Sequence, residues 1–375
     1  MHILIVALHR ATKPTGVCRH AANLARCLAE TDEVTKITLV TGVWQQHYFK
    51  TAFLLNSEKI QILAIDIRNN SISRNAWFLL GLPKLAKKIQ PELVHLSFPL
   101  PFWRSQIPYP VVVTIHDLYP YKIPENFGSK QAFFNRLFLR QSIKDSDAII
   151  CVSRTTLADL EYYFPEVVSN NQKTKVIYNI VDFDLVEAKP LKVLADKHDR
   201  PFILCVGQHR KNKNIDLLIK SYALLRDEHK LNDKTRLVVV GSVGPETENL
   251  VQSIEQLSLS DSVLILPEID DNELCWLYQN CRLFVIPSSL EGFCIPLVEA
   301  LYFSCRVVCS DIPIFREIGS SNCTYFDLMN DPIDNMAQSI SESLTAEFSP
   351  EYDECARFEI KEIATQYLNY YAELI

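Results

Sequence analysis

Glycine is scarce in this chain. Only nine of its 375 residues are glycine, against about 7% in an average protein, so each glycine is expected to stand where the backbone needs it. The sequence has no C-x-x-C pair, and its eleven cysteines are scattered, several within apolar runs. A reduced cysteine in such a run acts as a small hydrophobic residue. Cys305 and Cys309 have no histidine near them in the sequence, which argues against zinc.

Long apolar runs and a surplus of basic residues are also missing, and the first residues do not resemble a signal peptide. No apolar run approaches 18 residues, so we expect no membrane span. The formal net charge of −7 argues against nucleic acid as a partner. Residues 2–8 are apolar, but they are too few for a signal peptide and lack its basic start and its cleavage site. We therefore expect a soluble, cytoplasmic protein.

Short apolar runs alternate with helical patterns, and the alternation restarts after a charged stretch that ends near residue 200. We predict strands at 2–8, 37–41, 60–65, 93–96, 111–115, 148–152, 202–206, 237–240, 263–266, 283–286, 307–309 and 324–326. We predict helices at 17–28, 77–89, 133–142, 155–163, 215–225, 250–257, 271–279 and about 350–375. Strands that alternate with helices form βαβ units and a parallel sheet. The length suits two such α/β domains, each Rossmann-like.

One strand–loop–helix carries two carboxylates. After the apolar run 283–286, a loop contains Glu291 and Gly292, and Pro296 stands where the first turn of a helix would be. Free N–H groups at a helix start attract phosphate, and Glu299, one turn inside, could accept hydrogen bonds from the hydroxyls of a ribose. These features suit a nucleotide sugar. An ordinary loop and helix with two solvated glutamates would have the same spacing.

The stretch from Glu291 to Glu299, EGFCIPLVE, resembles the E-x7-E signature of retaining glycosyltransferases of family 4, commonly written EGFG-x-P-x-x-E. The preceding Pro287-Ser288 matches the PS of that family, whereas Cys294 replaces its usual second glycine. The resemblance covers nearly the whole chain. It implies the GT-B fold, in which two Rossmann-like domains face each other across a cleft. The implied parts are an acceptor-side domain at 1–180, a linker at 181–200, a nucleotide-sugar domain at 201–350 and a helix at 351–375 that returns to the first domain.

A basic loop follows the predicted strand at 202–206. Clustered positive charge beside a helix start suits a diphosphate leaving group, on which negative charge grows in the transition state, although solvated basic loops have the same composition. The segment is similar to the family's VG-x5-KN, which implies that Lys213 binds the diphosphate. Gln208 stands where many members carry arginine, and we predict that Arg210 supplies this second cation.

His116 and Asp117 follow the predicted strand 111–115, at its carboxyl end, where ligands bind in open α/β sheets. An isolated His-Asp is usually a capping or packing pair. The segment resembles the HD-L-x-P element of family 4, which implies that His116 lies close to the transferred sugar, with Asp117 orienting it or shaping the loop.

Further loops continue the resemblance. Gly16 opens a helix, as in the family's glycine-containing loop near the donor phosphate and the acceptor, and residues 240–244 resemble the VVG-x-G turn that lines the donor site. Residues 266–270 match the segment near the nucleotide base. The donor-binding residues implied in this way are Glu299, Gly16, Gly207, Gly241, Phe293, Cys294, Ile295, Ser288 and Pro267.

Two D-x-D matches, Asp145 to Asp147 and Asp182 to Asp184, are predicted to be incidental, since the first lies in a turn and the second in the linker. Family 4 mostly uses side-chain cations on the diphosphate, so we predict no required metal and no cofactor besides the nucleotide sugar. Ser304 and Arg306 stand where the family usually has glycine and proline.

Two helical segments, 77–88 and 133–144, combine aromatic residues with basic ones. Such a helix could lie on an anionic membrane surface, where lipid-linked acceptors reside. A packed helix with a solvated lysine edge explains the same pattern and is the interpretation that we favour for both.

The resemblance implies a retaining, metal-independent transferase that moves a hexosyl group to a hydroxyl of a glycan or lipid-linked glycan, with Glu291, Lys213, His116 and Arg210 as the catalytic residues. Surface polysaccharide assembly and a mannosyl donor, GDP-mannose, are favoured. Attack is expected on the front face, and Glu291 as a covalent nucleophile is the lesser alternative. A dinucleotide enzyme is disfavoured because no G-x-G-x-x-G follows the first strand. A glycosyl phosphorylase, a sugar-nucleotide epimerase and a non-catalytic GT-B homologue that binds sugar nucleotide or a protein partner remain alternatives.

Overall fold

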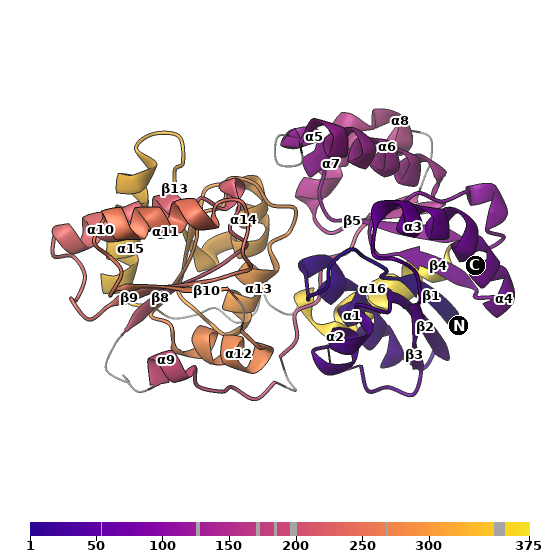
Figure 1. Cartoon of the computed structure of the whole chain (residues 1–375), viewed down its shortest axis with the longest axis horizontal. Coiled ribbons are helices and arrows are strands. Elements are labelled where there is room, and N and C mark those ends of the chain that lie inside the picture. The colour runs from indigo at the N-terminus through magenta and orange to yellow at the C-terminus, as the bar shows by residue number, and fades with distance from the viewer. Residues whose placement is uncertain are drawn as a thin grey trace. The chain divides into compact units, whose positions relative to one another are not determined.

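The computed structural model of the chain describes residues 1–53, 55–124, 128–169, 173–183, 186–195, 201–267, 269–348 and 357–375. Contacts divide the chain into two compact units (Figure 1). Unit 1 comprises Met1–Ile180 together with Arg357–Ile375, and unit 2 comprises Val181–Ala356. Among the described residues, no helix combines the length and the apolarity that crossing a bilayer would require.

Unit 1 is built around a seven-stranded sheet in the order β3-β2-β1-β4-β5-β6-β7, and every pair of neighbouring strands is parallel. The strands are β1 His2–Val6, β2 Lys36–Gly42, β3 Ile60–Ile65, β4 Leu93–Leu96, β5 Val111–Ile115, β6 Ala148–Cys151 and β7 Lys173–Val176. The helices are α1 Gly16–Ala29, α2 Gln46–Thr51, α3 Ser71–Ala76, the π-helix η1 Trp77–Gly81, α4 Leu82–Ile89, the short 3₁₀ helix η2 Arg104–Gln106, α5 Tyr119–Lys122, α6 Ser129–Asp145, α7 Arg154–Tyr163, α8 Pro165–Ser169 and α16 Ile360–Ala372.

The central strands of this sheet are buried on both faces, as their continuous apolar sequences require. Alternate residues of β1 enter two different clusters, Ile3 and Ile5 on one face and Leu4 and Val6 on the other. The first cluster also contains residues of α1 and α16, so residues 357–375 complete the core of unit 1.

Unit 2 contains a six-stranded sheet in the order β10-β9-β8-β11-β12-β13, again with parallel neighbours. The strands are β8 Phe202–Val206, β9 Arg236–Val240, β10 Val263–Leu266, β11 Leu283–Ile286, β12 Val307–Ser310 and β13 Cys323–Phe326. The helices are α9 Lys192–Ala195, the 3₁₀ helix η4 Lys211–Lys213, α10 Ile215–Asp227, α11 Thr247–Gln256, α12 Asp271–Asn280, α13 Ile295–Tyr302, α14 Pro313–Gly319, the 3₁₀ helix η5 Ser320–Asn322 and α15 Pro332–Thr345.

All twelve strands predicted from the apolar runs are present, each within a few residues of its predicted bounds. The sequence did not predict β7, α14 or α15, nor the short helices α2, α3, α5, α8 and α9. The last helix, predicted from about residue 350, begins later: α16 starts at Ile360. The predicted stretch 350–356 lies outside the described residues, as do residues 184–185 and 196–200 of the predicted linker. All ten described cysteines are free thiols and most are buried, as expected.

Candidate functional site

The candidate site of unit 2 lies where the sheet reverses its order. β8 is hydrogen-bonded to β9 on one side and to β11 on the other. The chain runs from β8 to β9 toward one edge of the sheet, and from β11 to β12 toward the opposite edge. In open α/β folds such a point forms a crevice at the carboxyl edge of the sheet, where ligands bind, and here the loops after β8 and β11 would bound it. Lys213 belongs to the first loop and Glu291 to the second.

Lys213 and Glu291 form a buried ion pair in this crevice, with the Lys213 ammonium donating to Glu291 Oε1. The side chains are 19% and 7% exposed. Burial by itself would lower the pKa of Lys213, but the charge of Glu291 and the hydrogen bond to it outweigh burial, so the pKa is raised. The lysine is therefore a fixed positive charge, and its role in binding a diphosphate stays a prediction.

Two asparagines hold the loops that carry this pair. Asn212 Nδ2 donates to the Leu290 carbonyl at 3.1 Å, and Asn214 Nδ2 donates to the Pro287 carbonyl at 2.9 Å. The main chains also meet, since Ser289 N donates to the Asn212 carbonyl at 2.9 Å. The sequence pattern did not assign roles to these amides, because their partners lie more than seventy residues away.

Helix α13 begins directly after the loop of Glu291. Cys294 precedes it in the left-handed region, with φ 74°, a conformation that favours glycine, which is the family's usual residue here. Burial, followed by the charge of Glu291, raises the pKa of Cys294 well above its ordinary value, so its thiol stays neutral. Phe293 and Ser288 are buried, whereas Ile295 is partly exposed at the helix start.

Glu299 projects from the first turn and a half of α13 into the interior of unit 2 and is 4% exposed. The hydroxyl of Tyr278, on α12, donates to Glu299 Oε2 at 2.8 Å. Sequence reasoning missed Tyr278. A buried tyrosine hydroxyl needs a partner, but an isolated sequence does not identify a partner on another helix.

Two predicted glycines come together beside this crevice. A Cβ on Gly241 would overlap the carbonyl oxygen of Gly207, so the loops after β8 and β9 approach as closely as their backbones allow. A Cβ on Gly244 would likewise overlap the carbonyl oxygen of His209. The Nδ1 of His209 is hydrogen-bonded to the Thr247 hydroxyl at 2.9 Å. Two of the scarce glycines therefore occur where the loops after β8 and β9 meet.

Two predicted site residues of unit 2, Arg210 and Pro267, are not buried. Arg210 is partly exposed after β8, and no carboxylate pairs with it within the described part of the chain. Pro267 is exposed at the end of β10.

In unit 1, His116 follows β5 and Gly16 opens α1. His116 Nε2 lies 2.8 Å from the Ser97 carbonyl, so this nitrogen carries the proton and Nδ1 is an acceptor. Burial lowers the pKa of His116 to about 4, which makes the ring neutral at pH 7. Asp117 accepts from Tyr119 N at 3.0 Å, as expected for a residue that shapes the loop. Gly16 is exposed, and a Cβ there would meet nothing within 4 Å.

His116 belongs to a histidine cluster that the sequence did not predict. The ring of His20, on α1, lies edge-to-face on His116 with centroids 4.7 Å apart, and His20 Nδ1 bonds Asn179 Oδ1 at 2.7 Å. His95 is fully buried nearby, held by Thr114 at 2.9 Å and by Tyr371 of α16 at 2.6 Å.

Among the described residues, no group of three or more potential ligands is arranged for a metal ion. The first D-x-D match is structural, because Asp147 accepts from Arg104 at 3.0 Å and from Val111 N at 2.7 Å. In the second match, Asp184 lies outside the described residues. That no metal is required stays a prediction.

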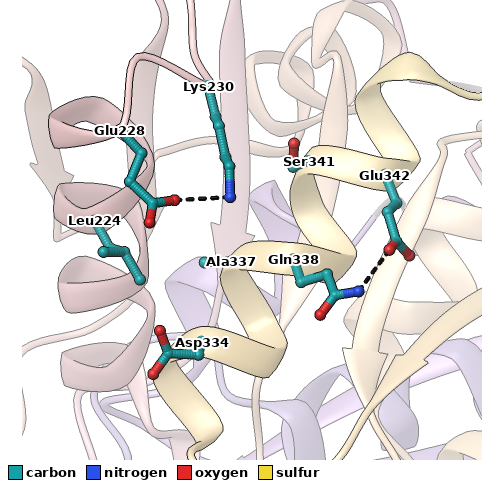
Figure 2. Close-up of a pocket in the computed structure, with 8 residues that line it drawn as sticks. All are labelled: Leu224, Glu228, Lys230, Asp334, Ala337, Gln338, Ser341 and Glu342. Atoms are coloured by element: carbon teal, nitrogen blue, oxygen red, sulfur yellow. Dashed lines mark hydrogen bonds and ion pairs between the residues drawn. The ribbon is translucent and has the colours of Figure 1, made fainter.

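A surface pocket elsewhere in unit 2 contains none of the candidate residues (Figure 2). It lies between α10 and α15, and its wall includes the Glu228–Lys230 ion pair, 2.8 Å long, and the bond from Gln338 to Glu342, also 2.8 Å. The polar groups at its rim are largely paired with one another, and none comes from the loops after β8 or β11.

Two family models match the chain. The model "Glycosyltransferase Family 4" matches residues 14–185, and "Glycosyl transferases group 1" matches residues 188–359. The O-antigen chain mannosyltransferase RfbU of Salmonella typhimurium is 28% identical over 329 residues, 86% of each chain.

A second relative matches over a shorter stretch. The N-acetylgalactosamine-N,N'-diacetylbacillosaminyl-diphospho-undecaprenol 4-alpha-N-acetylgalactosaminyltransferase of Campylobacter jejuni is 33% identical over 186 residues, which is 50% of this chain and 46% of that protein. Sucrose-phosphate synthase from Thermosynechococcus elongatus has a similar structure, with a TM-score of 0.75 at 19% identity over 100% of this chain and 98% of that one. This structural likeness concerns the fold.

Proposed function

The chain belongs to glycosyltransferase family 4 and has the GT-B fold, and from this premise we propose that it is a retaining transferase that moves a hexosyl group from a nucleotide-diphosphate sugar to a glycan or lipid-linked glycan. The observation that carries the proposal is the buried Lys213–Glu291 pair at the switch point of the unit 2 sheet. It brings together a permanent cation and a carboxylate beside a helix start, which is the combination that a diphosphate linked to a sugar requires.

In this proposal the diphosphate rests on the N–H groups at the start of α13 and on Lys213, with Arg210 as a second cation. Glu299 holds the ribose hydroxyls. Glu291 contacts the hydroxyls of the sugar, and donor binding shifts Lys213 from its carboxylate partner toward the phosphate. The ammonium then offsets the charge that develops as the glycosyl–phosphate bond breaks.

His116 of unit 1 is a neutral histidine, and we propose that it takes part in the same reaction. Because His116 keeps its proton on Nε2, its Nδ1 accepts a hydrogen bond from a hydroxyl of the transferred sugar. We propose front-face attack, in which the leaving phosphate takes the proton of the acceptor hydroxyl, and no required metal.

The donor is proposed to be GDP-mannose and the product a surface polysaccharide. The support is the name of the Salmonella relative, an O-antigen mannosyltransferase that matches over 86% of both chains. The Campylobacter relative transfers a different sugar, as its name states, so the donor has to be identified by experiment.

The first test is thermal shift with UDP, GDP, ADP and their sugar conjugates, since a ligand of the folded state raises its melting temperature. We expect one nucleotide to stabilise the protein and Glu299→Ala to reduce the shift sharply. Lys213→Ala should retain nucleotide binding in part but reduce turnover of the matching sugar nucleotide strongly. Absence of a shift with every nucleotide, in a well-folded sample, would contradict the proposal.

A non-catalytic role is the second candidate, favoured by one observation. Cys294 and Ser304 have positive φ where family members usually carry glycine. The two roles differ in turnover: a non-catalytic homologue would bind a nucleotide sugar without transferring or hydrolysing it. Restoring glycine at both positions would then leave turnover absent.

For α6 we propose contact with a membrane, in place of the packed helix favoured from the sequence, because apolar side chains of this helix are exposed. Its Phe133, Phe134 and Leu137 are 63%, 44% and 48% exposed, and Arg140 is exposed on the same helix. In the 77–89 segment, by contrast, Trp77 and Phe78 pack into the core. In a flotation assay the protein should rise with vesicles that contain anionic lipid, whereas the double variant Phe133→Ser, Phe134→Ser should stay in the bottom fraction. Equal flotation of the two proteins would contradict this proposal.

A further inference from the structure

We infer that Tyr278 is the positioning residue for Glu299, and that its hydroxyl enables the site to distinguish a ribonucleotide from one without ribose hydroxyls. This inference rests on the proposed function, because it assigns Glu299 to the ribose. Its geometric basis is the 2.8 Å hydrogen bond between the Tyr278 hydroxyl and Glu299 Oε2. Both side chains are buried, at 1% and 4% exposure.

The direction of this bond follows from its chemistry. A carboxylate only accepts, so the phenol donates. Burial, together with the charge of Glu299, raises the pKa of Tyr278 well above its ordinary value, and the phenol therefore keeps its proton. A second acceptor, the Pro296 carbonyl, is 3.4 Å from the same hydroxyl, which is long for an O–H···O bond. Glu299 is thus the main partner.

The ring of Tyr278 cannot easily turn away from Glu299. It stacks on Phe303 with the ring planes 13° apart and the centroids at 5.7 Å, and its centroid lies 5.6 Å from that of Phe284. Its main-chain carbonyl accepts a hydrogen bond from Cys305 Sγ at 3.1 Å. Three elements, β11, α12 and the turn after α13, therefore fix the hydroxyl that holds the carboxylate.

A carboxylate held in this way is oriented before the ligand arrives. Glu299 stands on α13, the same helix whose start is proposed to bind the diphosphate, so its distance from the phosphates is set by the helix. Without the phenol, the carboxylate would lose a charge-assisted bond and would turn to other partners. Ligand binding would then include the work of reorienting it.

The test compares Tyr278→Phe with the wild type, using the nucleoside diphosphate that the thermal-shift panel selects and its 2′,3′-dideoxy counterpart. The measured quantity is the ratio of the two dissociation constants. We expect the wild type to prefer the ribonucleotide by about tenfold or more. Tyr278→Phe should reduce this preference to about threefold or less, while binding of the dideoxy nucleotide stays nearly the same.

Tyr222→Phe is the matched control. Tyr222 is also fully buried in unit 2, but its hydroxyl donates to the Thr235 carbonyl at 2.6 Å, away from Glu299. This variant should lose stability and keep the ribose preference. If Tyr278 had only a structural role, Tyr278→Phe would weaken the binding of both nucleotides equally. The ratio of the two dissociation constants would then be unchanged, and this result would overturn the inference.

Glu299→Gln tests the same bond from its other end. The amide oxygen still accepts from Tyr278, so this variant should keep part of the preference that Glu299→Ala loses. If Glu299→Gln and Glu299→Ala lost the ribose preference to the same extent, the inference would be overturned, even if Tyr278→Phe failed to fold. If the wild type binds no nucleotide, the proposed function fails together with the inference; if it binds but the ratio does not respond to Tyr278→Phe, only the inference fails.

Discussion

Acid should destabilise unit 1 more than unit 2, because unit 1 buries several neutral histidines. Burial is the main cause in each of them: it lowers the pKa of His9 and His116 to about 4, that of His95 to about 3, and that of His20 well below the ordinary value. In the unfolded chain each would titrate near 6.5. The unfolded state therefore binds more protons, and stability is lost as pH falls from about 6.5 toward 4.

The size of the effect follows from the interval between the two pKa values. Between pH 7 and pH 5, protonation favours the unfolded state by about 2 kcal/mol for each histidine that stays neutral in the fold. His9, His95 and His116 together amount to roughly 6 kcal/mol, comparable with the whole stability of a typical domain, and His20 contributes in the same direction. In unit 2, burial lowers the pKa of His209, and the loss expected there is smaller.

The assay is amide hydrogen exchange followed by mass spectrometry at pH 7 and pH 5, corrected for intrinsic exchange rates. Peptides from β4 and β5 should lose far more protection than peptides from β8 and β9. In His95→Gln the difference between the two pH values should shrink by about 2 kcal/mol, or roughly 25-fold in protection, whatever the absolute stability of the variant. Equal losses in the two units, or an unchanged pH difference in His95→Gln, would refute the reasoning.

Two backbone predictions can be checked by urea unfolding. Gly241→Ala should lower the free energy of unfolding by at least about 2 kcal/mol and weaken nucleotide binding, since the new Cβ overlaps the Gly207 carbonyl; Gly16→Ala, where a Cβ meets nothing, is the control and should change the free energy by less than about 0.5 kcal/mol. Ser304→Gly should raise the free energy of unfolding by about 0.5–1 kcal/mol, because Ser304 has φ 54° just after α13. At this helix end the Ser304 N–H donates to the Leu301 carbonyl and the Cys305 N–H donates to the Ala300 carbonyl. A loss of stability in Ser304→Gly would contradict this explanation.

The sequence predicted the buried strands well because parallel strands covered on both faces require continuous apolar runs. It did not predict β7, Lys173–Val176, where two lysines in four residues conceal an edge strand. Helix α15 was also missed, because its buried face is narrow and includes a serine, Ser343, beside Met336 and Ile340.

For the candidate site, the motifs predicted which loops carry Lys213 and Glu291 but not how these loops are held. The bonds from Asn212 and Asn214, and that from Tyr278, join residues on different elements. Such pairings depend on the tertiary fold, which local patterns do not encode. The same holds for the histidine cluster of unit 1, whose members come from α1, β4 and the end of β5.

The division of the chain has a consequence for its synthesis on the ribosome. Domains generally fold as units and in the order in which they are made, but unit 1 is interrupted by unit 2 and includes residues 357–375. Ile363, Tyr367 and Tyr371 of α16 belong to its core, and His95 bonds Tyr371. Unit 2 is thus available to fold while unit 1 still has an uncovered apolar face, so the half of the protein that is translated first is completed last.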